Sequence, residues 1–315
     1  MPDSLIVKLP TPLAVVCHDA GSANIIFSWL ESAIEMDPDT ANFIKIFALG
    51  PSKKLLDSFD IGAVQRSSSI EEAVRDVTAV LTGTGWETST ELQALTLANK
   101  KGLRAIAVID HWVNYRKRFC IDGIHVDPKE IWVTDLYAKI IAEKKFPMAE
   151  VVLQVNCYLM RAVEKIKSMP KYDHEMKRVL YVLEPIREIW CMGSESGEFD
   201  ALNYFLSHLN DLSIGSIEEI RLRPHPSEPS NKYNRWLVRD GLPNLILDAS
   251  ASIESSIAWA DVVVGCQSMA MVVALKAERR VISSLPPWAP LCSLPHAGIE
   301  MMAKHLQIKH SKSEM

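Results

Sequence analysis

The strongest candidate for chemistry is His225, which stands between two prolines at the end of an apolar run (residues 220–228, IRLRPHPSE). The prolines restrict the backbone on both sides of the imidazole. A histidine held in this way can donate to a phosphate or protonate a leaving group. The motif therefore predicts a phosphate site, with Pro226 and Ser227 beside the histidine. The alternative is a structural histidine in a turn.

Arginines precede this histidine, and either Arg221 or Arg223 can add a charge-assisted contact to the same phosphate. Strand alternation predicts that both point to one face of the sheet. A second basic run, Arg116, Lys117 and Arg118, is typical of a solvated face.

A second phosphate-binding candidate follows the apolar run at 261–265, in the segment DVVVGCQSMA (261–270). Gly265 ends the run, and Gln267 and Ser268 open a helix whose first N–H groups suit a phosphate. The alternative is that Ser268 is an ordinary helix cap. Glu184 and Arg187 follow another apolar run, and we expect them to face the ligand unless they serve the fold alone.

In the first half of the chain, the segment VCHDAGSAN (16–24) reads as a strand, a glycine turn and the start of a helix. Backbone N–H groups at Gly21 and Ser22 can hold an anion or a sugar hydroxyl, and His18 and Asp19 should project toward the ligand. The alternative is a plain turn in which Asp19 caps the helix. The single glycine does not make a dinucleotide fingerprint.

Two further strand ends carry polar residues. In TGTGWETSTE (82–91) the spacing of Thr88 and Glu91 predicts a capping box, a structural role. Glu87 lies at the turn itself and is a candidate general base. In the loop 109–116 (IDHWVNYR) we expect Asp110 to be a candidate base.

The same loop contributes His111 and Asn114 as binding residues, because loops that a sheet holds in place often carry function. The alternative is a polar loop with Trp112 packed on the sheet.

The elements that position these residues are short apolar runs alternating with helix-length segments, a pattern that indicates parallel sheets built from βαβ units. We expect strands at 13–17, 43–48, 79–81, 104–109, 130–133, 151–155, 179–183, 219–222, 244–247, 261–264 and 280–283.

A helical segment (158–167) runs into a polar stretch with a proline (168–173), after which the pattern restarts. The sequence thus predicts an α/β protein of two Rossmann-like domains, 1–165 and 166–315. We expect ligands in a cleft onto which the carboxyl ends of both sets of strands face.

Composition narrows the function classes. The chain has 315 residues, 48% hydrophobic and 23% charged, with a net charge of −5, which gives no indication of nucleic-acid binding. The six cysteines show no CxxC pair, so we expect neither a metal site nor a cofactor. Without a leader-like start or a membrane-length apolar run, we expect a cytoplasmic protein. Contact with a membrane surface and the oligomeric state are left open.

His225-Pro226 and the later Gln267-Ser268 at a helix start, in a second Rossmann-like half, resemble GT-B glycosyltransferases, and more narrowly bacterial sialyltransferase-like enzymes. In that family a His-Pro motif and a serine motif hold the phosphate of a CMP-activated nonulosonic acid. The family's double serine is here Gln267-Ser268. The Glu-Ala-Leu common in UDP-sugar enzymes is here Val273-Ala274-Leu275.

The resemblance implies transfer of a nonulosonic acid (of the sialic, pseudaminic or legionaminic type) from a CMP-activated donor to an acceptor hydroxyl of a glycan or protein. His225 and Ser268 would stabilise the phosphate, and Asp19, Glu87 or Asp110 would deprotonate the acceptor. The alternatives are a UDP-N-acetylglucosamine 2-epimerase, a polyol-phosphate transferase and a non-catalytic nucleotide-binding module.

Overall fold

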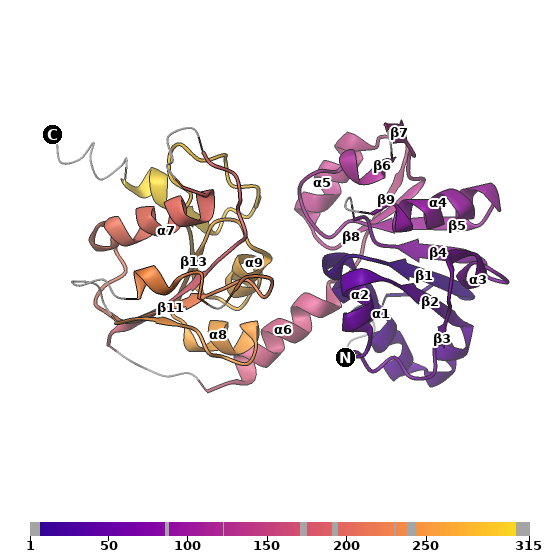
Figure 1. The fold of residues 1–315 in the computed structure, drawn as a ribbon. Helices are drawn as coiled ribbons and strands as arrows, with labels where there is room; N and C mark the ends of the chain where they lie inside the picture. The colour runs from indigo at the N-terminus through magenta and orange to yellow at the C-terminus, as the bar shows by residue number, and fades with distance from the viewer. Residues whose placement is uncertain are drawn as a thin grey trace. The chain divides into compact units, whose positions relative to one another are not determined.

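A computed structural model describes residues 7–85, 88–121, 123–170, 175–190, 195–229, 231–237 and 244–306. It divides into two compact units, Met1–Met160 and Arg161–Met315, so that the division falls within helix α6 (Cys157–Ser168). The sequence analysis puts the domain boundary at 165–166. Each unit is an α/β structure built on its own parallel sheet (Figure 1).

The sheet of the first unit has seven parallel strands in the order β3-β2-β1-β4-β5-β8-β9. The strands are β1 (Leu13–Cys17), β2 (Ile44–Ala48), β3 (Gln65–Arg66), β4 (Ala79–Thr82), β5 (Arg104–Val108), β8 (Glu130–Val133) and β9 (Glu150–Leu153). The α-helices of this unit, before α6, are α1 (Ala20–Met36), α2 (Gly50–Leu56), α3 (Ile70–Ala73), α4 (Thr90–Lys100) and α5 (Leu136–Lys145). Strands β6 (Cys120–Ile121) and β7 (Ile124–His125) form a separate antiparallel pair.

The central strands of this sheet are buried from end to end, as their apolar sequences require. Helix α1 packs its apolar side on the sheet, where the Trp29 ring meets the Trp132 ring edge to face at 5.6 Å. The Trp29 indole N–H also donates to the Val155 carbonyl oxygen at 2.7 Å. The core therefore fixes the sheet whose carboxyl ends carry the candidate residues.

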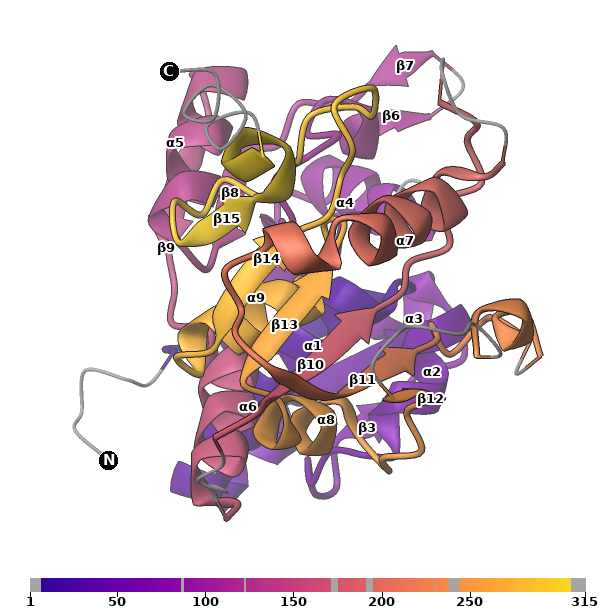
Figure 2. The same cartoon turned by 90° about the vertical axis from the view of Figure 1, so that its left-hand side faces the viewer.

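The second unit has six parallel strands in the order β12-β11-β10-β13-β14-β15 (Figure 2). They are β10 (Lys177–Val182), β11 (Ile217–Arg223), β12 (Asn244–Leu247), β13 (Val262–Gly265), β14 (Arg280–Ser283) and β15 (Ile299–Met301). Its further α-helices in the described residues are α7 (Gly197–Ser207), α8 (Ile253–Trp259) and α9 (Met269–Lys276). Tyr181, Phe205, Tyr233 and Trp236 are large side chains in its core.

The strand order locates the functional edge of each sheet. From β1 the chain builds outward to β3 and returns to place β4 on the other side, and β10 and β13 repeat this reversal. Ligands of such sheets bind outside the carboxyl ends of the strands at the reversal. The loops after β1, β4, β10 and β13 thus lie where ligands of such sheets bind.

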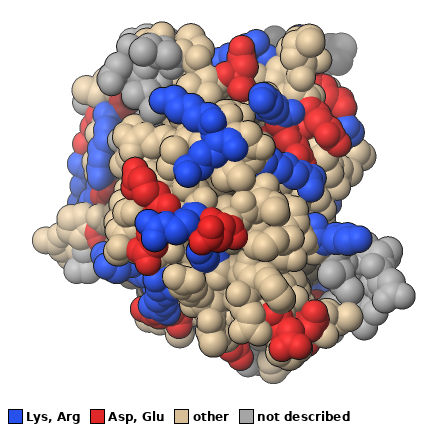
Figure 3. Space-filling model, turned by 90° about the vertical axis from the view of Figure 1, so that its right-hand side faces the viewer, with Lys and Arg blue, Asp and Glu red and all other residues tan. Residues whose placement is uncertain are grey.

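All the strands expected from the sequence are present, with ends that differ by a few residues. The sequence analysis missed β3, β6, β7 and β15, which have only two or three residues each. Strands this short give no periodic signal. In the described ranges, no helix has the length and apolar character needed to cross a membrane. On the face shown in Figure 3, Lys and Arg side chains are interspersed with Asp and Glu.

Candidate active site

Three loops of the first unit come together at the carboxyl ends of β1, β4 and β5, and glycines allow the close approach. A Cβ at Gly21 would lie 1.9 Å from Asp110 Oδ2, and one at Gly85 would lie 2.3 Å from Asp19 Oδ2. Both distances are far shorter than real Cβ contacts. The structure therefore places Asp110 against the first turn of α1 and Asp19 against the loop after β4.

His18 and Asp19 form a pair at the end of β1. His18 Nδ1 and Asp19 Oδ1 are 2.9 Å apart, and both side chains are partly buried. On its other side the ring lies against Gly50, whose φ of +55° belongs to the left-handed region. Asp19 stands at the N-cap of α1 but makes no capping hydrogen bond with its side chain. Its carboxylate is instead paired with an imidazole.

Arg118 is a site residue that the sequence analysis missed. Its guanidinium is buried, and Nη1 donates to Asp110 Oδ1 at 2.8 Å and to the Thr84 carbonyl oxygen at 2.8 Å. Nε donates to the Val113 carbonyl oxygen at 3.2 Å. The basic run predicted a solvated face, and for Arg118 that prediction is wrong. This side chain orients Asp110 and ties the loops after β4 and β5 together.

Glu91 is a second missed residue, and its predicted capping role is wrong. The side chain is buried, and its carboxylate accepts from the His18 N–H at 3.0 Å and from the Gly85 N–H at 2.7 Å. Burial raises the pKa of this carboxyl group. Glu91 shares the buried face of α4 with Leu95 and Ala98, at helical spacing. That position was the signal in the sequence.

The other residues of the first unit that the sequence predicted to bind a ligand have the following surroundings. His111 Nδ1 accepts from the Trp112 N–H at 2.9 Å, and burial lowers the pKa of the ring. Asn114 is exposed with a φ of +61°, typical of a turn. Ser22 is buried, and its hydroxyl has no hydrogen-bond partner in the described part of the chain. Glu87 lies outside the described residues.

In the second unit, Glu184 stands at the reversal point of the sheet, after β10. Its Oε1 accepts from the Gln267 N–H at 2.7 Å and from the Cys266 N–H at 3.1 Å. Burial of the carboxyl group raises its pKa to about 7. A carboxylate of the chain itself thus occupies the helix start at which the sequence predicted a phosphate.

Ser268 and Gln267 have internal partners. The Ser268 hydroxyl accepts from the Ala270 N–H at 3.2 Å as the N-cap of α9, the alternative that the sequence left open. Gln267 Oε1 accepts from the Ser293 N–H at 3.1 Å. Both residues therefore hold the start of α9 in place.

His225 is exposed at the same edge of the sheet, with Nδ1 2.7 Å from the Ser227 hydroxyl oxygen. It follows β11, while Ser268 follows β13, and β10 lies between these strands. Two strand spacings separate their backbones by roughly 10 Å. His225 and the start of α9 thus follow the two strands on either side of β10, the strand that Glu184 follows.

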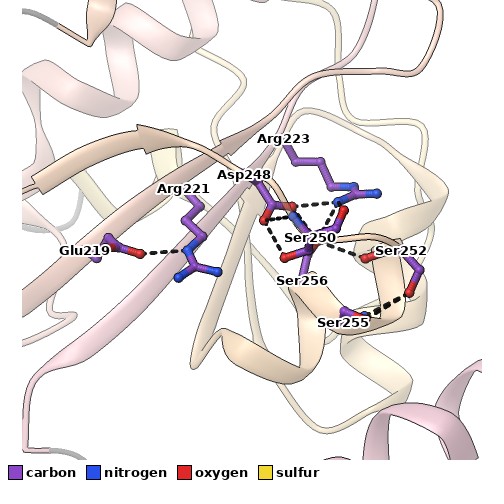
Figure 4. Close-up of polar contacts among 8 residues, drawn as sticks. All are labelled: Glu219, Arg221, Arg223, Asp248, Ser250, Ser252, Ser255 and Ser256. Carbon is purple, nitrogen blue, oxygen red and sulfur yellow. Dashed lines mark hydrogen bonds and ion pairs between the residues drawn. The ribbon is translucent and has the colours of Figure 1, made fainter.

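The arginines before His225 both contact α8, so they share one face of β11 (Figure 4). Arg223 Nη1 donates to Asp248 Oδ2 at 2.7 Å, to Ser256 Oγ at 2.7 Å and to the Ser250 carbonyl oxygen at 3.1 Å. The Arg221 guanidinium lies 3.8 Å from the centre of the Trp259 ring. This network attaches α8 and the loop after β12 to the sheet. It also occupies Nη1 of Arg223, one of the two arginines that the sequence predicted as a phosphate contact.

Arg187 belongs to a cluster of four charged residues. It pairs with Glu228, three positions after His225, and with Glu198 at 3.5 Å. Lys232 pairs with the same two carboxylates. The cluster links the loop after β10 to the loop that carries His225, so Arg187 holds the histidine loop in place.

Comparison with known proteins bears on the fold. No model of a protein family and no curated protein matches the sequence. Among solved structures, the UDP-GlcNAc 2-epimerase from Methanocaldococcus jannaschii is similar with a TM-score of 0.60 and 11% identity, over 96% of this chain and 92% of that one. The MnaA–UDP structure from S. aureus gives 0.59 and 11%, over 95% and 87%. The chain has the GT-B fold.

A glycosyltransferase of the same GT-B fold, that of kitacinnamycin, is similar with a TM-score of 0.53 and 11% identity, over 97% of this chain and 91% of that one. The predicted fold class, two Rossmann-like α/β domains, is confirmed. In the described residues of this GT-B chain, no group of three or more His, Cys, Asp or Glu is arranged to hold a metal ion.

Proposed function

We propose that this GT-B chain is a glycosyltransferase that moves a sugar from a nucleotide-activated donor to an acceptor hydroxyl. The observation that carries the proposal is the convergence of Asp19 and Asp110 at the carboxyl ends of β1, β4 and β5, against glycines whose added Cβ would meet the two carboxylates. The buried side chains of Glu91 and Arg118 hold these loops in place through hydrogen bonds. Carboxylates held in fixed positions suit the removal of a proton from a hydroxyl.

Of the two carboxylates, Asp19 is the better candidate for the base. Its partner is the His18 imidazole, which can take up the proton that the carboxylate removes. The partner of Asp110 is the Arg118 guanidinium, which holds its protons permanently. Asp110 is suited to binding and orienting the acceptor hydroxyl.

In the second unit, His225 and a protonated Glu184, which is hydrogen-bonded to the start of α9, would hold the donor phosphate and stabilise the charge that develops as the nucleotide leaves. Burial raises the pKa of the Glu184 carboxyl group to about 7, so its protonated form is accessible near neutral pH. A protonated Glu184 can donate to a phosphate oxygen. Donor binding would therefore favour its protonated form.

For the donor, we propose a CMP-activated nonulosonic acid. The support is the resemblance of His225-Pro226 and Gln267-Ser268 to the sialyltransferase-like enzymes, together with Val273 at the position where UDP-sugar enzymes have a glutamate. The second candidate is a 2-epimerase acting on UDP-N-acetylglucosamine, because two of the similar solved structures are described with UDP-GlcNAc 2-epimerase activity or with bound UDP.

A thermal-shift panel of CMP, UDP and CDP separates these candidates. A ligand at a hundredfold excess over its Kd stabilises the folded protein by about 2.7 kcal/mol. We expect the largest shift with CMP, and release of CMP from a CMP-sugar in the presence of acceptor. Conversion of UDP-N-acetylglucosamine to its epimer without acceptor supports the second candidate, and no response to any nucleotide contradicts both.

The catalytic assignment is tested with Asp19→Asn, which removes the base and keeps the size of the side chain. We expect CMP to stabilise this variant as it does the wild type, while transfer falls by at least about a hundredfold. The matched control is Asp39→Asn, at an exposed carboxylate of the same unit. Full transfer by Asp19→Asn contradicts the assignment.

A further inference from the structure

Helix α5 presents an exposed apolar stripe. Its Ala138 and Ala142 are buried, whereas Leu136 and Ile140, one turn apart, are 64% and 63% exposed. Tyr137, next to them, is 40% exposed. Residues four positions apart share one helix face, so Leu136, Ile140 and Tyr137 form a stripe on the side turned away from the sheet. We call these three residues the α5 stripe.

Further apolar side chains are exposed near this helix. Met148, in the loop after α5, is 94% exposed, and Leu153, at the end of β9, is 43% exposed. Strand β9 is the edge strand of its sheet, and α5 packs beside it, as Figures 1 and 2 show. Single exposed apolar residues are ordinary on a protein surface, but several on one helix and its neighbours indicate an interaction surface.

Positive charge gathers at the C-terminal end of α5, whereas Asp135 stands at its N-cap and Glu150 on β9 adds a further carboxylate. Helix α5 ends in Lys144 and Lys145, which are both exposed. Lys139 lies in the middle of the helix, and its Nζ is 2.5 Å from Glu143 Oε1. The helix thus has three lysines and one acidic residue. An apolar helix face with flanking lysines fits the headgroup region of an anionic bilayer, where lysines meet lipid phosphates and the apolar side chains reach the acyl chains.

On the same unit, a second pair of exposed apolar side chains has acidic neighbours in place of lysines. Met36 is 60% exposed and Phe43 is 53% exposed, and the acidic Asp37 and Asp39 lie between them in the sequence. Like charges would repel this surface from an anionic membrane. The two surfaces therefore differ in charge while they share exposed apolar side chains, and the second is a matched control for the first.

We propose that α5 docks the protein on anionic lipid bilayers, with the α5 stripe inserted at headgroup depth and Lys144 and Lys145 bound to lipid phosphates. The proposal rests on exposure and charge alone and is independent of the proposed function. A helix of this length that lies on the surface gives reversible binding rather than permanent anchoring.

Sedimentation with lipid vesicles tests the proposal on the full chain. We expect the protein to pellet with phosphatidylcholine vesicles that contain phosphatidylglycerol and to stay in the supernatant with phosphatidylcholine alone. The double variant Leu136→Ser, Ile140→Ser should lose this binding, and the control Met36→Ser, Phe43→Ser should keep it. No pelleting with anionic vesicles, or equal loss in both variants, overturns the proposal.

The charge contribution is measured separately. Each lysine near an anionic surface raises the partition coefficient between membrane and water about fivefold. The double variant Lys144→Gln, Lys145→Gln should therefore bind about 25-fold more weakly. The control is Lys53→Gln, Lys54→Gln, the exposed lysine pair in the last turn of α2. If sedimentation velocity shows self-association that the Leu136→Ser, Ile140→Ser change abolishes, α5 is a contact between copies and the membrane proposal is wrong.

Discussion

Replacement of Glu184 by glutamine should remove a specific part of the dependence of stability on pH. In the folded protein, burial raises the pKa of Glu184 from 4.5 to about 7. A carboxyl group with a raised pKa binds its proton more tightly in the folded state than in the unfolded state. Its contribution to stability is therefore fully present below about pH 4.5 and is lost as the pH rises through about 7.

The size of this effect follows from the shift. A difference of about 2.5 pKa units, at 1.36 kcal/mol per unit, amounts to about 3 kcal/mol over the window from about pH 4.5 to pH 8. In Glu184→Gln the amide oxygen can still accept from the N–H groups of Cys266 and Gln267, but it does not titrate. The variant should thus gain stability relative to the wild type as the pH rises.

Urea unfolding of both proteins at several pH values from about 5 to about 8 measures this difference. Any constant offset between the two proteins reflects the altered hydrogen bonding of the amide, and only the change with pH reports the titration. The control is Glu71→Gln, which makes the same change from carboxyl to amide at an exposed position of α3. A difference for Glu184→Gln that stays constant across the pH range refutes the assignment of its carboxyl group to a buried site.

Four further outcomes are expected. Glu91→Ala leaves two N–H groups without their acceptor and should lower the free energy of unfolding by roughly 2–4 kcal/mol, measured by urea denaturation. Gly21→Ala should displace Asp110 and reduce transfer by at least about tenfold while CMP still stabilises the protein, since the added Cβ meets the carboxylate. His225→Ala should abolish transfer while the circular dichroism spectrum stays unchanged, and normal activity would contradict its role at the phosphate. Treatment with EDTA should leave transfer unchanged, because the proposed mechanism uses side chains alone; activity that returns only with added metal would contradict it.

The sequence by itself determined most of the strands and marked the loops after them as candidate sites. Apolar runs bounded by glycine and polar residues are local patterns, and burial of both sheet faces requires them. They sufficed to predict the fold class and to find the strand-end loops with His18, Asp19, Asp110, Glu184 and His225. The strands of two or three residues were missed because so short a segment carries no period.

Only the tertiary structure decided which side chains meet. Glu91 reaches the backbone of His18 across 73 positions of sequence, and Glu184 reaches Cys266 across 82. Such contacts follow from the order of strands within each sheet, which the local pattern does not encode. For the same reason a solvated-looking Arg118 proved to be buried against Asp110, because a charged side chain can be buried when the fold supplies a partner for its charge and acceptors for its N–H groups.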